Sequence, residues 1–148
     1  MSYLQGNELV LAERWMELAA VEARKSLCLS RRCGTVIVKD GEVIGRGYNA
    51  PPKDNIAIRS CDSGRPDSCV HAEWRAIIDA AGKLEGATLY FTAVDENGVI
   101  LKSGEPYCTV CSRLALDSGV AKFVLWQEAG MNEYPTDEYN QSSYANRG

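Results

Sequence analysis

The sequence lacks a long hydrophobic run and any excess of positive charge. No apolar stretch approaches the roughly 18 residues that a membrane-spanning helix needs. The first residues, MSYLQGNELVLAERW, are polar and predict a helix instead of a secretory signal. The formal charge is -4, whereas proteins that coat nucleic acid need basic residues to neutralise phosphates. The composition therefore argues against a membrane protein and against a nucleic-acid-binding protein, and we expect a cytoplasmic protein.

Histidine is scarce, whereas cysteine is not. The chain has one histidine, His71, among 148 residues. A chain of this length that is 45% hydrophobic can bury the core of one domain without disulfide bonds. Several cysteines in a cytoplasmic protein therefore indicate metal binding or catalysis. The six cysteines are Cys28, Cys33, Cys61, Cys69, Cys108 and Cys111.

The order of the predicted elements indicates an α/β fold. Apolar residues at helical spacing predict a helix over 8–26, and β-rich runs on either side of Asp40-Gly41 predict a hairpin. Residues 50–70 are rich in proline and glycine and predict a loop. We expect further helices over 71–82 and 108–119, and further strands over 87–93, 99–103 and 122–126. Strands that alternate with helices predict a sandwich around a mixed sheet.

The C-terminal part of the chain carries no periodic signal. From Gln127 on, the sequence is polar and acidic, with scattered tyrosines. We therefore expect one domain over 1–126 and a tail over 127–148 that is extended or disordered. The tail could also pack on a neighbouring copy, and we expect the protein to be a homo-oligomer.

The spacing of His71 and two cysteines predicts a metal site. Cys108-Thr-Val-Cys111 begins a predicted helix, where thiols deprotonate readily because helix N-termini favour negative charge. By itself this motif also fits redox dithiols and structural zinc knuckles. His71 begins the preceding helix, and two successive helices on one face of a sheet can bring their N-termini together. One histidine and two cysteines then hold zinc and leave the fourth tetrahedral position to water, as in catalytic sites.

Glu73 has a role beside such a metal. Its carboxylate can take a proton from the activated water and return it to a substrate nitrogen. The alternative is a structural zinc module without catalysis. A purely structural site has no use for a carboxylate two residues from its histidine, so we expect an enzyme.

Four segments carry a resemblance to the cytidine deaminase superfamily, and most closely to its deoxycytidylate (dCMP) deaminases. They are CGTVIVKDGEVIGRGYNAPP, CVHAEWRAI, LEGATLYFT and EPYCTVCSRLALDSGVAKFVLW. His-x-Glu followed by Pro and Cys-x-x-Cys is the signature of zinc nucleobase deaminases. The resemblance covers roughly residues 10–126. It implies a three-layer α/β sandwich with a central mixed sheet of about five strands and helices on both faces.

The resemblance also implies a reaction, which is the zinc-dependent hydrolysis of dCMP to dUMP and ammonia. Three features depart from the family pattern. Tyr107 separates Pro106 from Cys108, residues 94–105 form an inserted hairpin, and Arg75 stands where the dCMP branch usually has Asn. A nucleoside, another nucleobase or another nucleotide therefore stays open as the substrate.

Further site residues follow from the resemblance. Asn49 would bond the sugar hydroxyl, the backbone at Ala72 and the Cys108 turn would hold the base edge, and Tyr107 would line the pocket. Each of these also has a structural alternative, such as a turn residue for Asn49. Candidates for contact with a phosphate are Arg31, Arg32 and Lys53, although a solvated surface role fits each of them alone.

The remaining cysteines raise the question of a second metal. Cys28, Cys61 and Cys69 fall where some dCMP deaminases place ligands for a structural zinc. The alternative is a set of buried, inert thiols. We expect Cys33, which begins a predicted strand, to be a small core residue.

Overall fold

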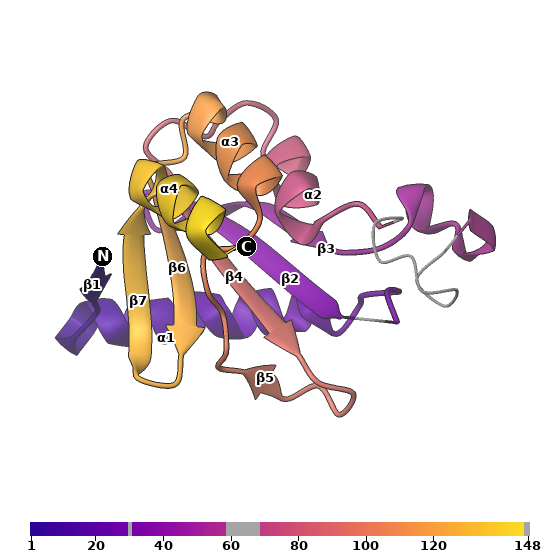
Figure 1. Ribbon diagram of the computed structural model, residues 1–148, viewed down its shortest axis with the longest axis horizontal. Coiled ribbons are helices and arrows are strands. Elements are labelled where there is room, and N and C mark those ends of the chain that lie inside the picture. Colours follow the sequence, from indigo (N-terminus) through magenta and orange to yellow (C-terminus); the bar gives the residue numbers. More distant parts are fainter. Residues whose placement is uncertain (30, 59–68, 147–148) are drawn as a thin grey trace.

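The computed structural model describes residues 1–29, 31–58 and 69–146 (Figure 1). These residues form a seven-stranded sheet of order β1-β7-β6-β4-β2-β3, with β5 paired to β4. Strands β4 and β6 are parallel and the other neighbours are antiparallel, so the predicted mixed sheet is confirmed. The strands are β1 (Ser2–Tyr3), β2 (Arg32–Lys39), β3 (Glu42–Tyr48), β4 (Thr88–Val94), β5 (Ile100–Leu101), β6 (Lys122–Gln127) and β7 (Gly130–Pro135).

Helices cover both faces of this sheet (Figure 1). Helix α1 (Gly6–Ala23) lies on one face, and α2 (Ala72–Asp79), α3 (Thr109–Ser118) and α4 (Thr136–Asn146) lie on the other. The predicted three layers are therefore confirmed, whereas the expected number of about five strands was too low. Strands β1 and β5 have two residues each, which is too short for a periodic signal.

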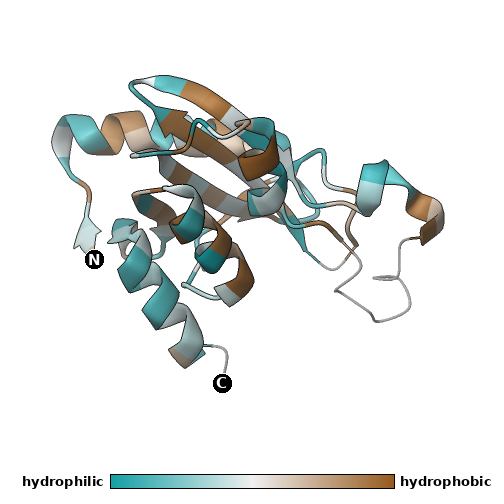
Figure 2. Cartoon of the chain, turned by 90° about the horizontal axis from the view of Figure 1, so that it is seen from above, coloured by the Kyte–Doolittle hydropathy of each residue, from teal (hydrophilic) through white to brown (hydrophobic). Residues whose placement is uncertain are grey.

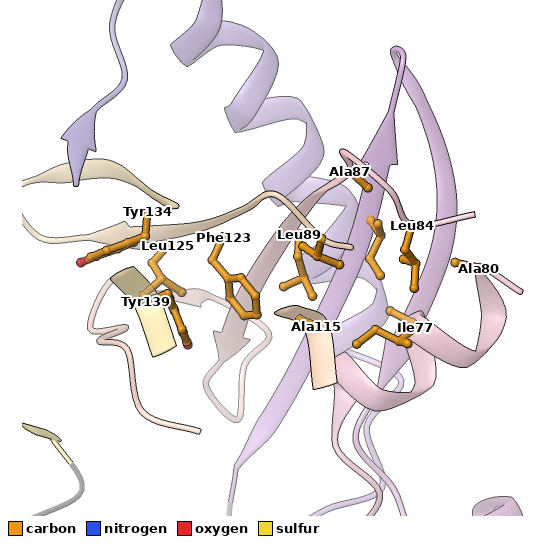
Figure 3. Close-up of a cluster of buried hydrophobic side chains, with 13 residues drawn as sticks. Ile77, Ala80, Leu84, Ala87, Leu89, Ala115, Phe123, Leu125, Tyr134 and Tyr139 are labelled. Carbon is orange, nitrogen blue, oxygen red and sulfur yellow. The ribbon is translucent and has the colours of Figure 1, made fainter. Parts of the chain in front are cut away.

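The alternation of side chains along each strand builds the two cores. In β2, Val36 packs on the α1 side while Ile37 packs on the side of the other three helices. In β6, Phe123 and Leu125 belong to the same core as Ile37, and Figure 3 shows both of them there. Val124 belongs to the core on the α1 side. Successive strand residues point to opposite faces. Both faces of the sheet are buried, so side chains that point to either face must be hydrophobic. This explains the nearly continuous hydrophobic runs of β2 and β6.

Two glycines of β3 allow α2 to lie close to the sheet. A Cβ atom on Gly47 would lie 2.3 Å from the carbonyl oxygen of Ala72, and one on Gly45 would lie 2.3 Å from that of Ala76. Real Cβ atoms do not approach a backbone oxygen this closely. The glycines therefore determine the depth at which α2 packs, and with it the position of the residues at the start of that helix.

The predicted tail is folded, so the expectation of an extended or disordered segment is wrong for 130–146. Strand β7 pairs with β6 and buries Met131 and Tyr134. Helix α4 then returns over the sheet beside α3. Figure 2 shows that this last helix is mostly hydrophilic. It buries Thr136 and Ser143 together with Tyr139, and a polar face of this kind gives no hydrophobic period that a sequence pattern could reveal.

The loop predicted over 50–70 is described in part. Residues Pro52–Asp54 and Ile56–Ile58 form two short 3-10 turns, while 59–68, including Cys61, lie outside the described residues. None of the helices in the described part of the chain has both the length and the hydropathy of a membrane span.

Candidate metal centre

The structure brings His71, Cys108 and Cys111 together. Their donor atoms all lie within 4.8 Å of one another. The Nδ1 atom of His71 is 3.1 Å from the Cys111 sulfur and 3.4 Å from the Cys108 sulfur. Within residues 1–29, 31–58 and 69–146, no other group of three histidine, cysteine or acidic side chains clusters in this way.

Helix starts position all three donors. His71 is the N-cap of α2 and Cys108 is the N-cap of α3, while Cys111 lies in the first turn of α3. The backbone N–H of Cys111 donates a hydrogen bond of 3.2 Å to the Cys108 sulfur. The two helices pack side by side on one face of the sheet (Figure 1). The N-termini of both helices therefore lie at the same cluster, and the positive end of a helix dipole favours a thiolate there.

The local electrostatics favour a metal ligand at Cys108. A hydrogen bond with the Cys111 thiol, a second with His71 and the Cys111 backbone N–H together lower the pKa of Cys108 to about 4, against the effect of burial. Zinc prefers nitrogen and sulfur donors, and three of them leave one tetrahedral position open. The donor set and its spacing fit one zinc ion.

Glu73 lines the same pocket as His71 and Cys108 but is not one of the three clustered donors. The residue is only 5% exposed and lies in the first turn of α2. Burial raises the pKa of its carboxyl group, and the negative charge of Cys108 raises that pKa further. A buried carboxylate beside a metal centre is a candidate for proton transfer.

Glu73, His71 and Cys108 line a cavity of about 390 Å³. Its size falls within the range of about 300–1,000 Å³ that is typical of small-molecule sites. The three residues predicted to bind the substrate, Asn49, Ala72 and Tyr107, all line it. The cavity therefore brings together two of the predicted metal ligands, His71 and Cys108, with the predicted carboxylate and the predicted binding residues.

The amide of Asn49 is largely engaged within the protein. Its Oδ1 accepts hydrogen bonds from the Ser26 hydroxyl and from the Cys33 backbone N–H at 2.8 Å. Its Nδ2 donates to the Arg31 carbonyl oxygen at 2.6 Å. Asn49 thus joins the end of β3 to the segment that leads into β2. Among the described residues, one hydrogen of its amide has no acceptor and can serve a ligand.

Several further residues line the cavity. Arg31 reaches it, with its guanidinium carbon 5.8 Å from the centroid of the Phe91 ring, whereas Arg32 and Lys53 are not among its lining residues. The sequence patterns predicted no role for four of the lining residues, which are Phe91, Ser103, Glu105 and Tyr139. Ser103 and Glu105 both belong to the inserted segment over 94–105, and this departure from the family pattern was the only feature of the sequence that singled them out.

Cysteines 28, 33 and 69 are buried and line the same cavity. Burial raises the pKa of Cys33 to about 12, which suits the predicted small core residue. Cys28 and Cys69 are two of the three ligands expected for a second zinc. The third, Cys61, lies outside the described residues.

The comparison with known proteins shows to which family the chain belongs. The family model described as the cytidine and deoxycytidylate deaminase zinc-binding region matches residues 10–127. The chain belongs to this deaminase family. A deoxycytidylate deaminase of Mycobacterium phage D29 is 31% identical over 133 residues, which are 79% of this chain and 94% of the phage protein.

Two other relatives extend the comparison. A deoxycytidylate deaminase of Saccharomyces cerevisiae is 30% identical over 131 residues, but this deaminase chain matches only 38% of the yeast protein's length and 80% of its own. The crystal structure of the dCMP deaminase of cyanophage S-TIM5, in complex with dCMP and dUMP, superposes with a TM-score of 0.61. It is 22% identical and covers 81% of this chain and 82% of the phage chain. That likeness supports the fold.

Proposed function

We propose that this deaminase converts dCMP and water to dUMP and ammonia. The proposal depends mainly on Glu73, a buried carboxylate that lines one cavity with His71 and Cys108, two of the three zinc-type donors. A structural zinc module gains nothing from such a group, so this placement favours catalysis. The choice of dCMP is supported by the relatives, because those from yeast and phage D29 are deoxycytidylate deaminases and the S-TIM5 enzyme was solved with dCMP and dUMP.

Different residues of this chain would perform different parts of the reaction. His71, Cys108 and Cys111 would hold zinc, which when bound lowers the pKa of a water molecule and so makes it a nucleophile at neutral pH. Glu73 accepts a proton from the attacking water and passes it to N3 of the base. Once the C4–O bond has formed, Glu73 takes the second proton from the new hydroxyl at C4 and transfers it to the amine. The C4–N bond then breaks, the C4 carbonyl forms, and the amine leaves as ammonia.

The other cavity residues would orient the nucleotide. The backbone at Ala72 and at the Cys108 turn holds the polar edge of the base, and Tyr107 forms part of the wall. The remaining amide hydrogen of Asn49 donates to the sugar hydroxyl. Arg31 is the one cationic side chain among the residues known to line the cavity, and we assign the phosphate to it. Charge-assisted hydrogen bonds of this kind are about twice as strong as neutral ones.

A free nucleoside is the second candidate substrate. Glu105 lines the same cavity, and its carboxylate would repel a phosphate while accepting a hydrogen bond from a sugar hydroxyl. Ammonia release from dCMP, deoxycytidine, cytidine, cytosine and the matching adenine compounds separates the two. We expect dCMP to have a much higher kcat/KM than deoxycytidine, and Arg31→Gln to reduce that preference. Equal kcat/KM values would identify a nucleoside deaminase instead.

We further propose a second, structural zinc held by Cys28, Cys61 and Cys69. The burial of Cys28 and Cys69, which both line the same cavity, supports this assignment. Metal analysis of protein purified without chelator should give two zinc ions per chain, and Cys61→Ser should lose one of them together with thermal stability. One zinc per chain in the wild type would exclude the second site.

We also propose a homo-oligomer that acts in the cytoplasm. Apolar side chains on the outer faces of α2 and α3 support self-association, since Ile78 is 74% exposed and Leu114 is 40% exposed. Light scattering should give a mass that is a multiple of 16.2 kDa. A monomeric mass at micromolar concentration would contradict the proposal.

A further inference from the structure

Arg75 is one of the three departures from the family pattern, and the proposed reaction gives it no role. It lies on α2, two residues after Glu73. Its Nη1 atom is 3.0 Å from Oδ1 of Asp54, and its Nη2 donates a hydrogen bond of 2.9 Å to the carbonyl oxygen of Pro51. Arg75 is not among the residues that line the cavity. Its guanidinium group therefore contacts the loop over residues 51–58 and does not bind a ligand in the cavity.

Tyr48, the last residue of β3, completes this network of contacts. Its ring centroid lies 5.0 Å from the guanidinium carbon of Arg75. Its hydroxyl donates a hydrogen bond of 2.6 Å to Oδ2 of Asp54, so both oxygens of that carboxylate are bonded. A planar guanidinium can stack on an aromatic ring while it bonds a carboxylate, whereas a lysine ammonium is a point charge. One arginine thus joins α2 to the end of β3 and to the loop that follows.

The loop has little else to hold it. Residues 52–58 are exposed and none of these described residues packs in a hydrophobic core. Lys53 and Asp54 both have a φ angle of 58°, which residues other than glycine seldom adopt and which persists only where the surroundings hold it. In the described part of the chain, Arg75 and Tyr48 are the only side chains outside the loop that form a hydrogen bond or ion pair with it.

The start of this loop adjoins two segments that line the cavity. Ala50 and Val70 exchange two backbone hydrogen bonds, of 2.7 and 3.3 Å. Asn49, directly before Ala50, and His71, directly after Val70, both line the cavity. The backbone bridge therefore joins the residue expected at the sugar to a metal donor, and the bond from Arg75 holds the chain one residue beyond the bridge.

We propose that Arg75 is a positioning residue, which holds loop 51–58 against the start of α2 and thereby fixes the placement of Asn49 relative to His71. This placement decides whether one nucleotide can reach Asn49 with its sugar and the metal centre with its base. A sugar contact is made in the bound substrate and in the transition state alike, so its loss raises KM and leaves kcat unchanged. Only this kinetic part of the inference rests on the proposed dCMP deamination.

The test is Arg75→Gln, which removes the charge and the paired donors. We expect KM for dCMP to rise about 10-fold with little change in kcat, a ratio comparable to the loss of one hydrogen bond to a charged group. Zinc content should equal that of the wild type, because every metal donor is retained. Hydrogen–deuterium exchange without substrate should become faster at the amides of Ala50 and Val70, because the bridge between them opens more often.

Asp54→Ala is a second variant that removes the partner of Arg75 from the loop. The Asp54 side chain is 41% exposed, so its removal does not disturb a core. We expect it to raise KM and to speed exchange in the same direction as Arg75→Gln. The double variant should differ little from the more strongly affected single variant, because residues in contact do not contribute additively.

Arg46→Gln is the matched control. Arg46 is an exposed residue of β3, and its side chain makes no hydrogen bond or ion pair with the described residues; its backbone N–H bonds Asp79 instead. The substitution removes the same charge from a neighbouring position. We expect this variant to keep the KM of the wild type and its exchange rates at Ala50 and Val70.

The outcomes separate the inference from the proposed function. If Arg75→Gln and Asp54→Ala keep the exchange rates of the wild type at Ala50 and Val70, the inference is wrong. Faster exchange with an unchanged KM would also overturn it, because Arg75 would then stabilise the loop without positioning the cavity. If the wild type binds zinc but releases no ammonia from dCMP, the proposed function is wrong. The exchange rates still decide in that case whether Arg75 holds the two segments together.

Discussion

The imidazole of His71 lies flat on the indole of Trp74, with ring centroids 4.2 Å apart and planes 4° apart. The two residues are one helical turn apart at the start of α2. This stacking fixes the plane of the histidine, so that Nδ1 is directed at the two cysteine sulfurs. An aromatic side chain therefore orients a metal ligand from within the same helix.

Trp74→Ala should weaken zinc binding by about 10-fold, because it leaves the imidazole free to rotate. Trp74→Phe should retain most of the affinity. The indole N–H finds no acceptor in the described part of the chain, so phenylalanine removes no hydrogen bond there. Chelator competition measures both variants, and equal affinities for Trp74→Ala and the wild type would contradict the orienting role.

Glu73→Gln should keep the fold and the zinc content but lose turnover by about 10²–10⁴-fold, because an amide cannot accept and return a proton. The matched control is Glu22→Gln. Glu22 is also buried, at 4% exposed, but it pairs with Lys25 on α1, away from the cavity. Steady-state ammonia release measures both variants. Near-normal turnover in Glu73→Gln would exclude the carboxylate as the proton carrier.

Gly47→Ala should displace the start of α2, because its Cβ would lie 2.3 Å from the Ala72 carbonyl oxygen. We expect the free energy of unfolding to fall by about 1–3 kcal/mol and turnover to fall with it. Urea unfolding of Gly104→Ala serves as the control, since a Cβ there meets Leu125 at 3.7 Å, an ordinary contact. A Gly47→Ala variant with wild-type stability and activity would show that α2 can shift without cost.

Asn49→Ala should lower the free energy of unfolding by about 1–3 kcal/mol, because it leaves the buried Cys33 N–H without its acceptor. If the remaining amide hydrogen also bonds the sugar, KM should rise while zinc content is unchanged. Urea unfolding and steady-state kinetics measure the two effects separately. Loss of stability with an unchanged KM would leave Asn49 a structural residue alone.

The metal centre was predictable because each of its residues carries a local signal. His71 is the single histidine, and Cys108 and Cys111 have the spacing of one helical turn at a helix start. The β2–β3 hairpin was equally clear, since Asp40 and Gly41 both adopt the positive φ angles, 51° and 76°, that a tight hairpin turn requires.

The C-terminal part of the site could not be predicted. Helix α4 consists of polar residues, and its helical state depends on packing against α3 and β7 and not on hydrophobic periodicity. Tyr139 reaches the cavity only because β7 adds to the edge of the sheet and returns the chain over it. No spacing in the sequence relates Tyr139 to Cys108. Only the folded structure shows that both residues line the same cavity.

The most direct test of the proposed function is the reaction itself. Zinc-loaded wild-type protein is incubated with dCMP, and dUMP and ammonia are quantified together, with Glu73→Gln as the control. We predict one ammonia for each dUMP formed by the wild type and almost none from Glu73→Gln. Absence of dUMP with fully zinc-loaded wild type, or equal rates in the two proteins, would contradict a dCMP deaminase that depends on Glu73.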